Sequence, residues 1–331
     1  MNFAFARSAY RAMRSTQTAA AWRSAAIALF AVLCASFATA AILPEPQRVS
    51  GHAWAWIGPY EGPAKSNNGF RMNLGFVVGT EAIAVIDTGY TREMAEEMVI
   101  AITRVSKLPI RYAVNTNSQP HRFMGNDVFR KAGARVISSV EAAARMSKDG
   151  GDFARTIASV LELKVAPMLP AVSDQLIEEK GSARFDLGGG VALEVMHFGR
   201  AHTGGSLVVR VTPDRVVFAG DVLYASRLLA VLPDSSVSGW IKAYERLATI
   251  DAKLFVPGHG QIGALNAFDQ PTLAYLRALK AHMDQAVKDG SDPSTAVRAF
   301  DASRWKHLVN FEELATRNAA LTFLESEREG F

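Results

Sequence analysis

The chain has 331 residues, of which 49% are hydrophobic, so it holds enough apolar material for one large domain or two small ones. Its formal charge of +4 comes from the first 40 residues, which carry four arginines and no acidic residue. The rest of the chain has 32 basic and 32 acidic residues, so its charge gives no argument for nucleic acid as a partner.

The first 40 residues are typical of a secretory signal peptide. Their basic residues precede an apolar run after Ser24, which ends in Ala38-Thr39-Ala40, a cleavage signal of small residues. The run is also long enough for a retained membrane anchor, but the cleavage signal favours removal near Ala40. Cys34 is the only cysteine, so the mature chain needs no disulfide. We therefore predict a periplasmic or secreted protein that is free of the membrane after cleavage.

The mature chain begins with a strand-like pattern followed by a helical one. Residues 52–60 alternate so that Trp54 and Trp56 fall on one face of a strand. Thr91 is a suitable N-cap for a helix that ends at about Val105. The apolar residues of that helix share one face and predict core packing: Met94, Met98, Ala101, Ile102 and Val105.

A short buried strand is predicted at residues 110–114, IRYAV, and it runs into a polar loop at residues 115–122. The segments after this loop predict a helix, a strand and two further helices, in the order 127–132, 135–139, 139–147 and 151–163. An irregular connection follows, marked by Pro167 and Pro170.

The second half of the chain is richer in strands. Four short strand-like runs follow one another: 183–187, 191–198, 206–211 and 215–220. Gly188-Gly189-Gly190 predicts a hairpin turn between the first two, because no helix follows it as a phosphate loop requires. A helix at 236–250 and a strand at 254–260 come next. The remainder, from Gln270 to about Glu325, is helical with a break at 288–294, and the whole order indicates an α/β fold.

Four of the apolar runs lie next to a side chain that can bind a metal, with glycine close by. These side chains are His121, His202, Asp221 and His259. Zinc needs about three or four nitrogen, oxygen or sulfur ligands that converge on one point. We therefore predict that the chemistry lies where these strand ends meet.

These motifs resemble the metallo-β-lactamase superfamily, whose pattern is T-H-x-H-x-D-H, then H-T-x-G, G-D and P-G-H-G. The last three motifs are present, with His202 in HTGGS, Asp221 in AGDV and His259 in VPGHG. The first motif differs, because the chain has Asn117, Gln119, His121 and Arg122 where the family has His, His, Asp and His.

The resemblance implies an αβ/βα sandwich, in which two mixed sheets are flanked by helices. It divides the chain into a signal peptide at 1–40, a metallo-β-lactamase-fold domain at 41–267 and a helical extension at 268–331 packed on that domain. The IDTG motif of residues 86–89 matches the family too, and we expect Asp87 to tie loops together beneath the site.

The resemblance also implies which residues hold metal. The first family site would keep only His202 and Asp221, because the amide oxygens of Asn117 and Gln119 are poor zinc ligands. A single zinc would instead be held by His121, Asp221 and His259, together with His202. Asp221 and His121 would be the catalytic residues, and a metal-bound hydroxide would attack an ester, thioester or amide-type small molecule.

A second interpretation stays open, in which the metal has been lost. Asn117, Gln119 and Arg122 would then be polar groups of a cleft that binds a small molecule without catalysis, as in an accessory protein. A narrower resemblance, carried by NLGFVVG, IDTG, PIRYAVNT, AHTGGSLVV and RNAALTFLE, is to exported zinc metallohydrolases of quinoprotein dehydrogenase systems. It implies a periplasmic role beside such a system.

Overall fold

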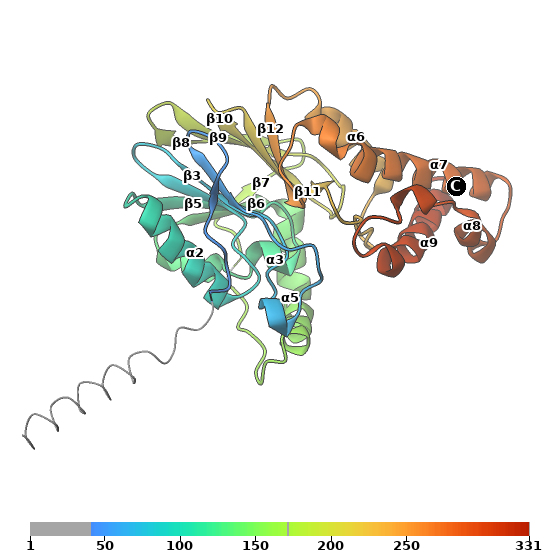
Figure 1. Cartoon of the computed structure of the whole chain (residues 1–331), viewed down its shortest axis with the longest axis horizontal. Coiled ribbons are helices and arrows are strands. Elements are labelled where there is room, and N and C mark those ends of the chain that lie inside the picture. Colours follow the sequence, from blue (N-terminus) through green and yellow to red (C-terminus); the bar gives the residue numbers. More distant parts are fainter. Residues whose placement is uncertain (1–40, 171, 331) are drawn as a thin grey trace, which may run out of the picture. The chain divides into compact units, whose positions relative to one another are not determined.

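Two β-sheets lie face to face in the part of the chain that the structure describes, residues 41–170 and 172–330 of a computed structural model (Figure 1). The first sheet has the order β1-β2-β3-β4-β5-β6-β7 and the second has the order β12-β11-β10-β9-β8. The predicted signal peptide lies outside the described residues.

The strands of the first sheet are β1 (Gln47–Arg48), β2 (Ala53–Trp56), β3 (Leu74–Val78), β4 (Ile83–Ile86), β5 (Ile110–Val114), β6 (Arg135–Ser139) and β7 (Gln175–Ile177). Those of the second are β8 (Ser182–Gly188), β9 (Val191–His197), β10 (Leu207–Thr212), β11 (Val216–Tyr224) and β12 (Leu254–His259). The helices are α2 (Arg92–Val105), α3 (Pro120–Phe123), α4 (Asn126–Lys131), α5 (Val140–Val160), α6 (Val237–Leu247), α7 (Tyr275–Lys288), α8 (Pro293–Ala299) and α9 (Phe311–Gly330). Short turns of other helix types are η1 (Lys65–Asn67), η2 (Leu265–Phe268), η3 (Asp269–Ala274) and η4 (Ser303–Trp305).

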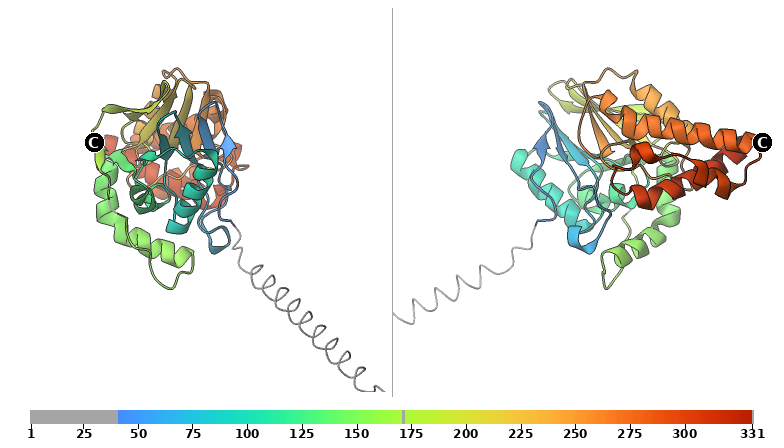
Figure 2. Two further views of the ribbon diagram at one scale, coloured as in Figure 1. Left: turned by 90° about the vertical axis from the view of Figure 1, so that its left-hand side faces the viewer. Right: turned by 45° about the vertical axis from the view of Figure 1, so that its right-hand side comes forward.

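Three apolar clusters hold these layers together. One lies between the two sheets and includes Val114, Val209 and Val256. A second packs α2 and α5 on the outer face of the first sheet. The third packs α6, α7 and α9 against the second sheet, and Figure 2 shows α7 and α9 running side by side. The predicted αβ/βα sandwich is therefore confirmed.

Parallel pairing decides where the polar loops meet. The first sheet is antiparallel from β1 to β4 and parallel from β4 to β7, and β11 pairs in parallel with β12. Because parallel strands end at the same edge, Asp87 after β4 and Asn115 after β5 come together. For the same reason, Asp221 near the end of β11 approaches His259 at the end of β12.

Several predicted elements are confirmed in detail. Helix α2 begins after Thr91, whose side chain accepts a hydrogen bond from the backbone N–H of Met94 at 3.2 Å. Its apolar face is buried except at Val105, which is 39% exposed. The run Gly188-Gly189-Gly190 turns between β8 and β9 with positive φ at all three residues, a conformation that glycine adopts without strain.

Two segments differ from their predictions. One helix, α5, replaces the two helices predicted over 139–147 and 151–163, and Gly150 lies inside it. A side chain at Gly150 would come within 3.0 Å of Leu169, so this glycine lets the following loop pack against the helix. The predicted polar loop also contains a short helix, α3, which begins at Pro120.

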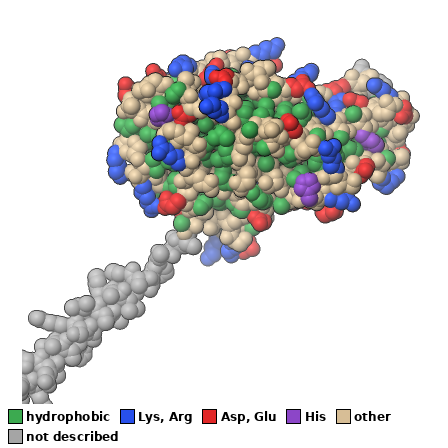
Figure 3. Space-filling model, turned by 45° about the horizontal axis from the view of Figure 1, so that its top comes forward, with side chains coloured by type: hydrophobic (Ala, Val, Ile, Leu, Met, Phe, Trp, Pro, Cys, Tyr) green, Lys and Arg blue, Asp and Glu red, His purple; other side chains and the backbone are tan. Residues whose placement is uncertain are grey.

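Charged side chains of both signs are interspersed over the face shown in Figure 3. Among the described residues, no helix is both long and apolar enough to cross a membrane.

The last helix, α9, is tied by hydrogen bonds to the segment between β11 and α6. The buried Asn318 accepts a hydrogen bond from Val231 N–H at 2.8 Å and donates one to the carbonyl of Leu229 at 2.8 Å. The carboxylate of Glu325 accepts one from Val237 N–H at 2.8 Å, at the start of α6. The C-terminal helix therefore fixes the backbone that follows β11.

Replacement of Asn318 by alanine is expected to lower the free energy of unfolding by about 2–3 kcal/mol, because it leaves buried backbone groups without partners. Urea denaturation of the variant measures this loss. Replacement of the exposed neighbour Arg317 by alanine is the matched control and should change stability by less than about 0.5 kcal/mol. Equal stability of the two variants would contradict the tethering role of Asn318.

Candidate metal centre

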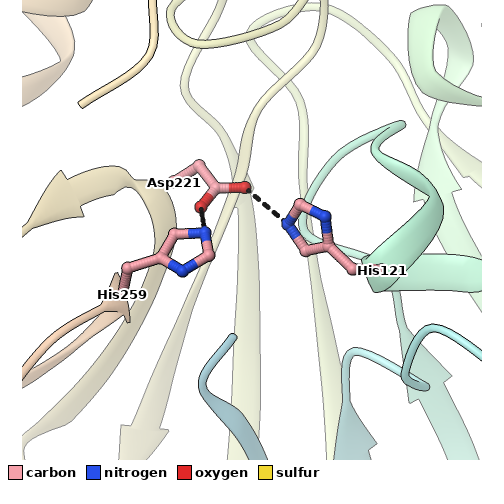
Figure 4. A group of neighbouring side chains, drawn as sticks. All are labelled: His121, Asp221 and His259. Carbon is pink, nitrogen blue, oxygen red and sulfur yellow. Dashed lines mark ion pairs between the residues drawn. The ribbon is translucent and has the colours of Figure 1, made fainter. Parts of the chain in front are cut away.

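Three buried side chains converge where the strand ends meet. They are His121 from α3, Asp221 from β11 and His259 from the end of β12, and their ligand atoms all lie within 4.8 Å of one another (Figure 4). His259 Nε2 is 3.3 Å from Asp221 Oδ1, and His121 Nε2 is 3.6 Å from Asp221 Oδ2. Residues far apart in sequence thus form one compact set of donor atoms.

The orientation of His259 is fixed by its second ring nitrogen. Nδ1 lies 2.8 Å from the carbonyl oxygen of Arg71, and since a carbonyl only accepts, Nδ1 carries the proton. Burial holds the pKa of His259 well below its usual value, so the ring is neutral. Its Nε2 therefore presents a lone pair to the carboxylate of Asp221, an arrangement that a cation between the two would stabilise.

Both histidines of the cluster have an Nε2 atom that is buried and has no hydrogen-bond partner. Burial, and then the charge of Arg122, lowers the pKa of His121 to about 3. Neutral imidazole is the form that binds metals. Buried polar atoms without partners are rare in folded proteins, so these two nitrogens fit a metal ion as their missing partner.

Arg122 is fully buried beside this cluster and uses all five of its donors on protein groups. Its Nη2 donates to Asp221 Oδ1 at 2.6 Å and its Nε to Asp221 Oδ2 at 3.1 Å. Its Nη1 donates to Asp87 Oδ2 at 3.0 Å. The remaining bonds go to the carbonyls of Asn73 at 2.9 Å and Gly258 at 3.1 Å. No donor of Arg122 is left for a ligand in the cleft.

The two oxygens of Asp221 differ in how many hydrogen bonds they accept. Oδ2 accepts from Arg122 and also from Asn117 Nδ2 at 2.7 Å, whereas Oδ1 accepts only from Arg122. Burial alone would raise the pKa of Asp221, but the charge of Arg122 lowers it well below its usual value. Asp221 is thus ionised, and Oδ1 keeps the freer lone pair on the side of His259.

His202 lies next to the cluster but farther from Asp221. Its Nε2 is 4.0 Å from Asp221 Oδ2, and its Nδ1 bonds to the carbonyl of Ala230 at 3.0 Å. Its ring packs edge-on against Trp240, with ring centroids 5.3 Å apart. Burial lowers the pKa of His202, so it too is a neutral imidazole.

The three polar residues predicted for the cleft have different surroundings. Asn117 is buried, donates to Asp221 and accepts a hydrogen bond from Gln119 N–H at 2.9 Å. Arg122 faces protein groups on every side. Only Gln119 is half-buried with a side-chain amide that makes no hydrogen bond to the described residues.

Asp87 lies beneath the site, as predicted. It accepts hydrogen bonds from Thr116 N–H at 2.7 Å and from Arg122, so it joins the loops after β4 and β5. Two neighbours of His259 were not predicted: Arg71, whose carbonyl orients His259, and Tyr224, whose ring centroid lies 5.0 Å from that of His259. The position of Tyr224, three residues after Asp221 at a strand end, was a signal that could have identified it.

Comparisons with known proteins agree with this architecture. The family model described as the metallo-beta-lactamase superfamily matches residues 69–259, more than half of the chain. A metallo-beta-lactamase from Pontibacter korlensis matches with a TM-score of 0.57 and 22% identity, over 70% of this chain and 98% of that one. A metallo-beta-lactamase from Hirschia baltica matches with a TM-score of 0.54 and 16% identity, over 70% of this chain and 96% of that one. At these identities the likeness to solved structures shows the fold.

Replacement of Arg122 by methionine should lower the free energy of unfolding by about 3–5 kcal/mol, because it leaves two buried carboxylates without their cation. Chemical denaturation compares the variant with an Arg277→Met control. Arg277 forms an exposed ion pair with Glu245, and its loss should change stability by about 1 kcal/mol or less. If Arg122→Met were no less stable than this control, Arg122 would not be the counter-ion of the site.

Proposed function

Because the chain belongs to the metallo-β-lactamase superfamily, we propose that it is a metal-dependent hydrolase that holds a single zinc ion through His121, Asp221 and His259. The observation that carries this proposal is the pair of buried, unpartnered Nε2 atoms on either side of the Asp221 carboxylate. His202, whose Nε2 lies 4.0 Å from Asp221 Oδ2, is a candidate fourth ligand.

The donor set suits zinc. Two neutral imidazole nitrogens and one ionised carboxylate oxygen match the ligand types of catalytic zinc sites, which keep an open position for water or substrate. A zinc ion bound there supplies Lewis acidity toward a carbonyl oxygen and lowers the pKa of water. We expect one ion rather than two, because the charge of Arg122 already neutralises Asp221.

The chain's own residues have separate roles in the proposed hydrolysis. Asp221, ionised by its contact with Arg122, accepts a hydrogen bond at Oδ1 and so orients the attacking water. His121 and His259 present fixed lone pairs to the site. The free amide of Gln119 is positioned to hydrogen-bond an ester, thioester or amide-type substrate beside them.

The alternative of a non-catalytic binding protein loses part of its basis. It relied on Asn117 and Arg122 as groups that bind a ligand in an open cleft. Both are buried, and every N–H group of the Arg122 side chain donates a hydrogen bond to the protein itself. The hydrolase is therefore the function that the geometry supports better.

We also propose that the protein works in the bacterial periplasm beside a quinoprotein dehydrogenase system. The support is the signal-like segment of residues 1–40, the absence of cysteine after it and the stretches shared with exported zinc metallohydrolases. Cell fractionation would test the location: the mature protein should appear in the periplasmic fraction.

The purified mature protein is expected to contain about one zinc ion per chain, as a mononuclear site requires. Mass spectrometry of metal content should show that His259→Ala loses this ion. His307→Ala is the control, since His307 is exposed and lies outside the site, and it should keep the ion. A wild-type protein that is metal-free, stays folded and does not bind added zinc would refute the proposal of a zinc hydrolase.

Hydrolysis of an ester, thioester or lactam substrate should fall by more than about 100-fold in His121→Ala, since loss of even a group that supports a ligand costs up to about that much. Removal of zinc by a chelator should abolish the activity, and added zinc should restore it. His307→Ala should react at the wild-type rate. Unchanged hydrolysis in His121→Ala would exclude His121 from the site.

A further inference from the structure

The first residues of the predicted mature chain are held by one carboxylate on helix α2. Glu97 Oε2 accepts a hydrogen bond from the backbone N–H of Ile42 at 2.8 Å and from that of Leu43 at 3.0 Å, and Oε1 accepts one from Ile42 at 3.1 Å. The ends of a chain are poorly ordered unless contacts hold them in place. Glu97 therefore fixes the backbone one residue beyond the predicted cleavage point.

Apolar packing and an ion pair hold the same segment along α2. Leu43 is buried in the apolar cluster beneath this helix, and Ile42 packs against the same cluster. Glu45 then pairs with Arg104 at 2.9 Å, about two helical turns beyond Glu97. The segment thus runs along α2 toward the end of the helix, and its contacts place its start beside Glu97.

Glu97 has no cation as a partner among the residues that the structure describes, although its side chain is half-buried. The residues one turn away on α2 are Glu93, Met94, Ile100 and Ala101. None of them is basic, and Glu93 carries a like charge. Removing a carboxylate from water without a cation has a cost in free energy. The two amide N–H groups offset part of this cost, and a positive charge at the same place would offset more.

Removal of the signal peptide would create such a charge. Hydrolysis of the Ala40–Ala41 peptide bond adds one water molecule and yields a carboxylate on Ala40 and an ammonium group on Ala41. Consecutive Cα atoms are about 3.8 Å apart, so this ammonium group lies within one residue of an N–H that Glu97 already binds. Glu97 Oε1 accepts a single hydrogen bond and keeps a lone pair for a second.

We propose that Glu97 binds the ammonium group that cleavage creates on Ala41, and that this ion pair stabilises the mature fold relative to the precursor. In the precursor the same nitrogen belongs to an uncharged amide, so the carboxylate has no cation there. Cleavage at this bond thus completes the charge balance around Glu97. The inference rests on the proposed export of the protein, and it does not depend on the zinc site.

A double-mutant cycle measured by urea denaturation tests this ion pair. A chain that begins at Ala41 is compared with a chain that carries Gly-Ser before Ala41, which moves the ammonium group two residues away. Each is prepared with Glu97 and with Glu97→Gln, whose amide oxygen still accepts hydrogen bonds from the backbone. With Glu97 present, the extension should raise the equilibrium constant for unfolding by about two- to fivefold, the range of a partly exposed ion pair. In Glu97→Gln it should have no effect.

Glu96→Gln is the matched control, because Glu96 is the next residue on α2, is exposed and pairs with Arg92 instead. The extension should keep its full effect in this variant. An extension that has the same effect with and without the Glu97 carboxylate would overturn the proposal. An extension that leaves the wild-type chain equally stable would overturn it too.

The N-terminal sequence of the exported protein tests the position of the charge. Protein purified from the periplasm should begin at Ala41, and a start at any other residue would overturn the proposal. Zinc content of the same chains separates this inference from the hydrolase. Coupling between the N-terminus and Glu97 in a chain that binds no zinc supports the ion pair and refutes the hydrolase alone. Normal zinc content without this coupling refutes the ion pair alone.

Discussion

The ion pair between Arg122 and Asp221 is the interaction on which the rest of the site depends. Asp221 belongs to the second sheet and Asp87 to the first, so the guanidinium between them joins the two sheets at the edge where their strands end. It also holds the carbonyl of Gly258, next to His259, and the carbonyl of Asn73, whose N–H bonds to Gly258. One buried cation therefore sets the charge of Asp221 and holds together the segments that carry His121, Asp221 and His259.

Much of the fold was predictable because its strands are short apolar runs and its site residues follow strand ends. Helix α2 was predicted from its cap and its periodicity, and the convergence of His121, Asp221 and His259 from motif order. The continuity of α5 was not predictable, since Gly150 is accommodated by packing against a distant loop. Arg122 was predicted to be a polar group of the cleft, but it is buried and completely hydrogen-bonded, for a similar reason. Sequence gives the number of its donors but not the carbonyls and carboxylates that surround them.

Arginines in this protein fall into two groups that sequence cannot distinguish. Arg122 is buried and completely paired, and its removal should destabilise the fold. Arg71 and Arg227 instead carry buried guanidinium nitrogens that have no hydrogen-bond partner among the described residues.

The tie between α9 and the backbone after β11 has a consequence for where the functional unit ends. The matched family region stops at residue 259, and all four metal-competent side chains lie within it. Yet Asn318 holds Val231, whose neighbour Ala230 supplies the carbonyl that orients His202. A chain truncated after residue 259 would contain every motif. It would lack the hydrogen bond from Val231 to Asn318, which supports the segment that orients the imidazole of His202. The final helix is therefore part of the minimal unit for any transplant of this site into another chain.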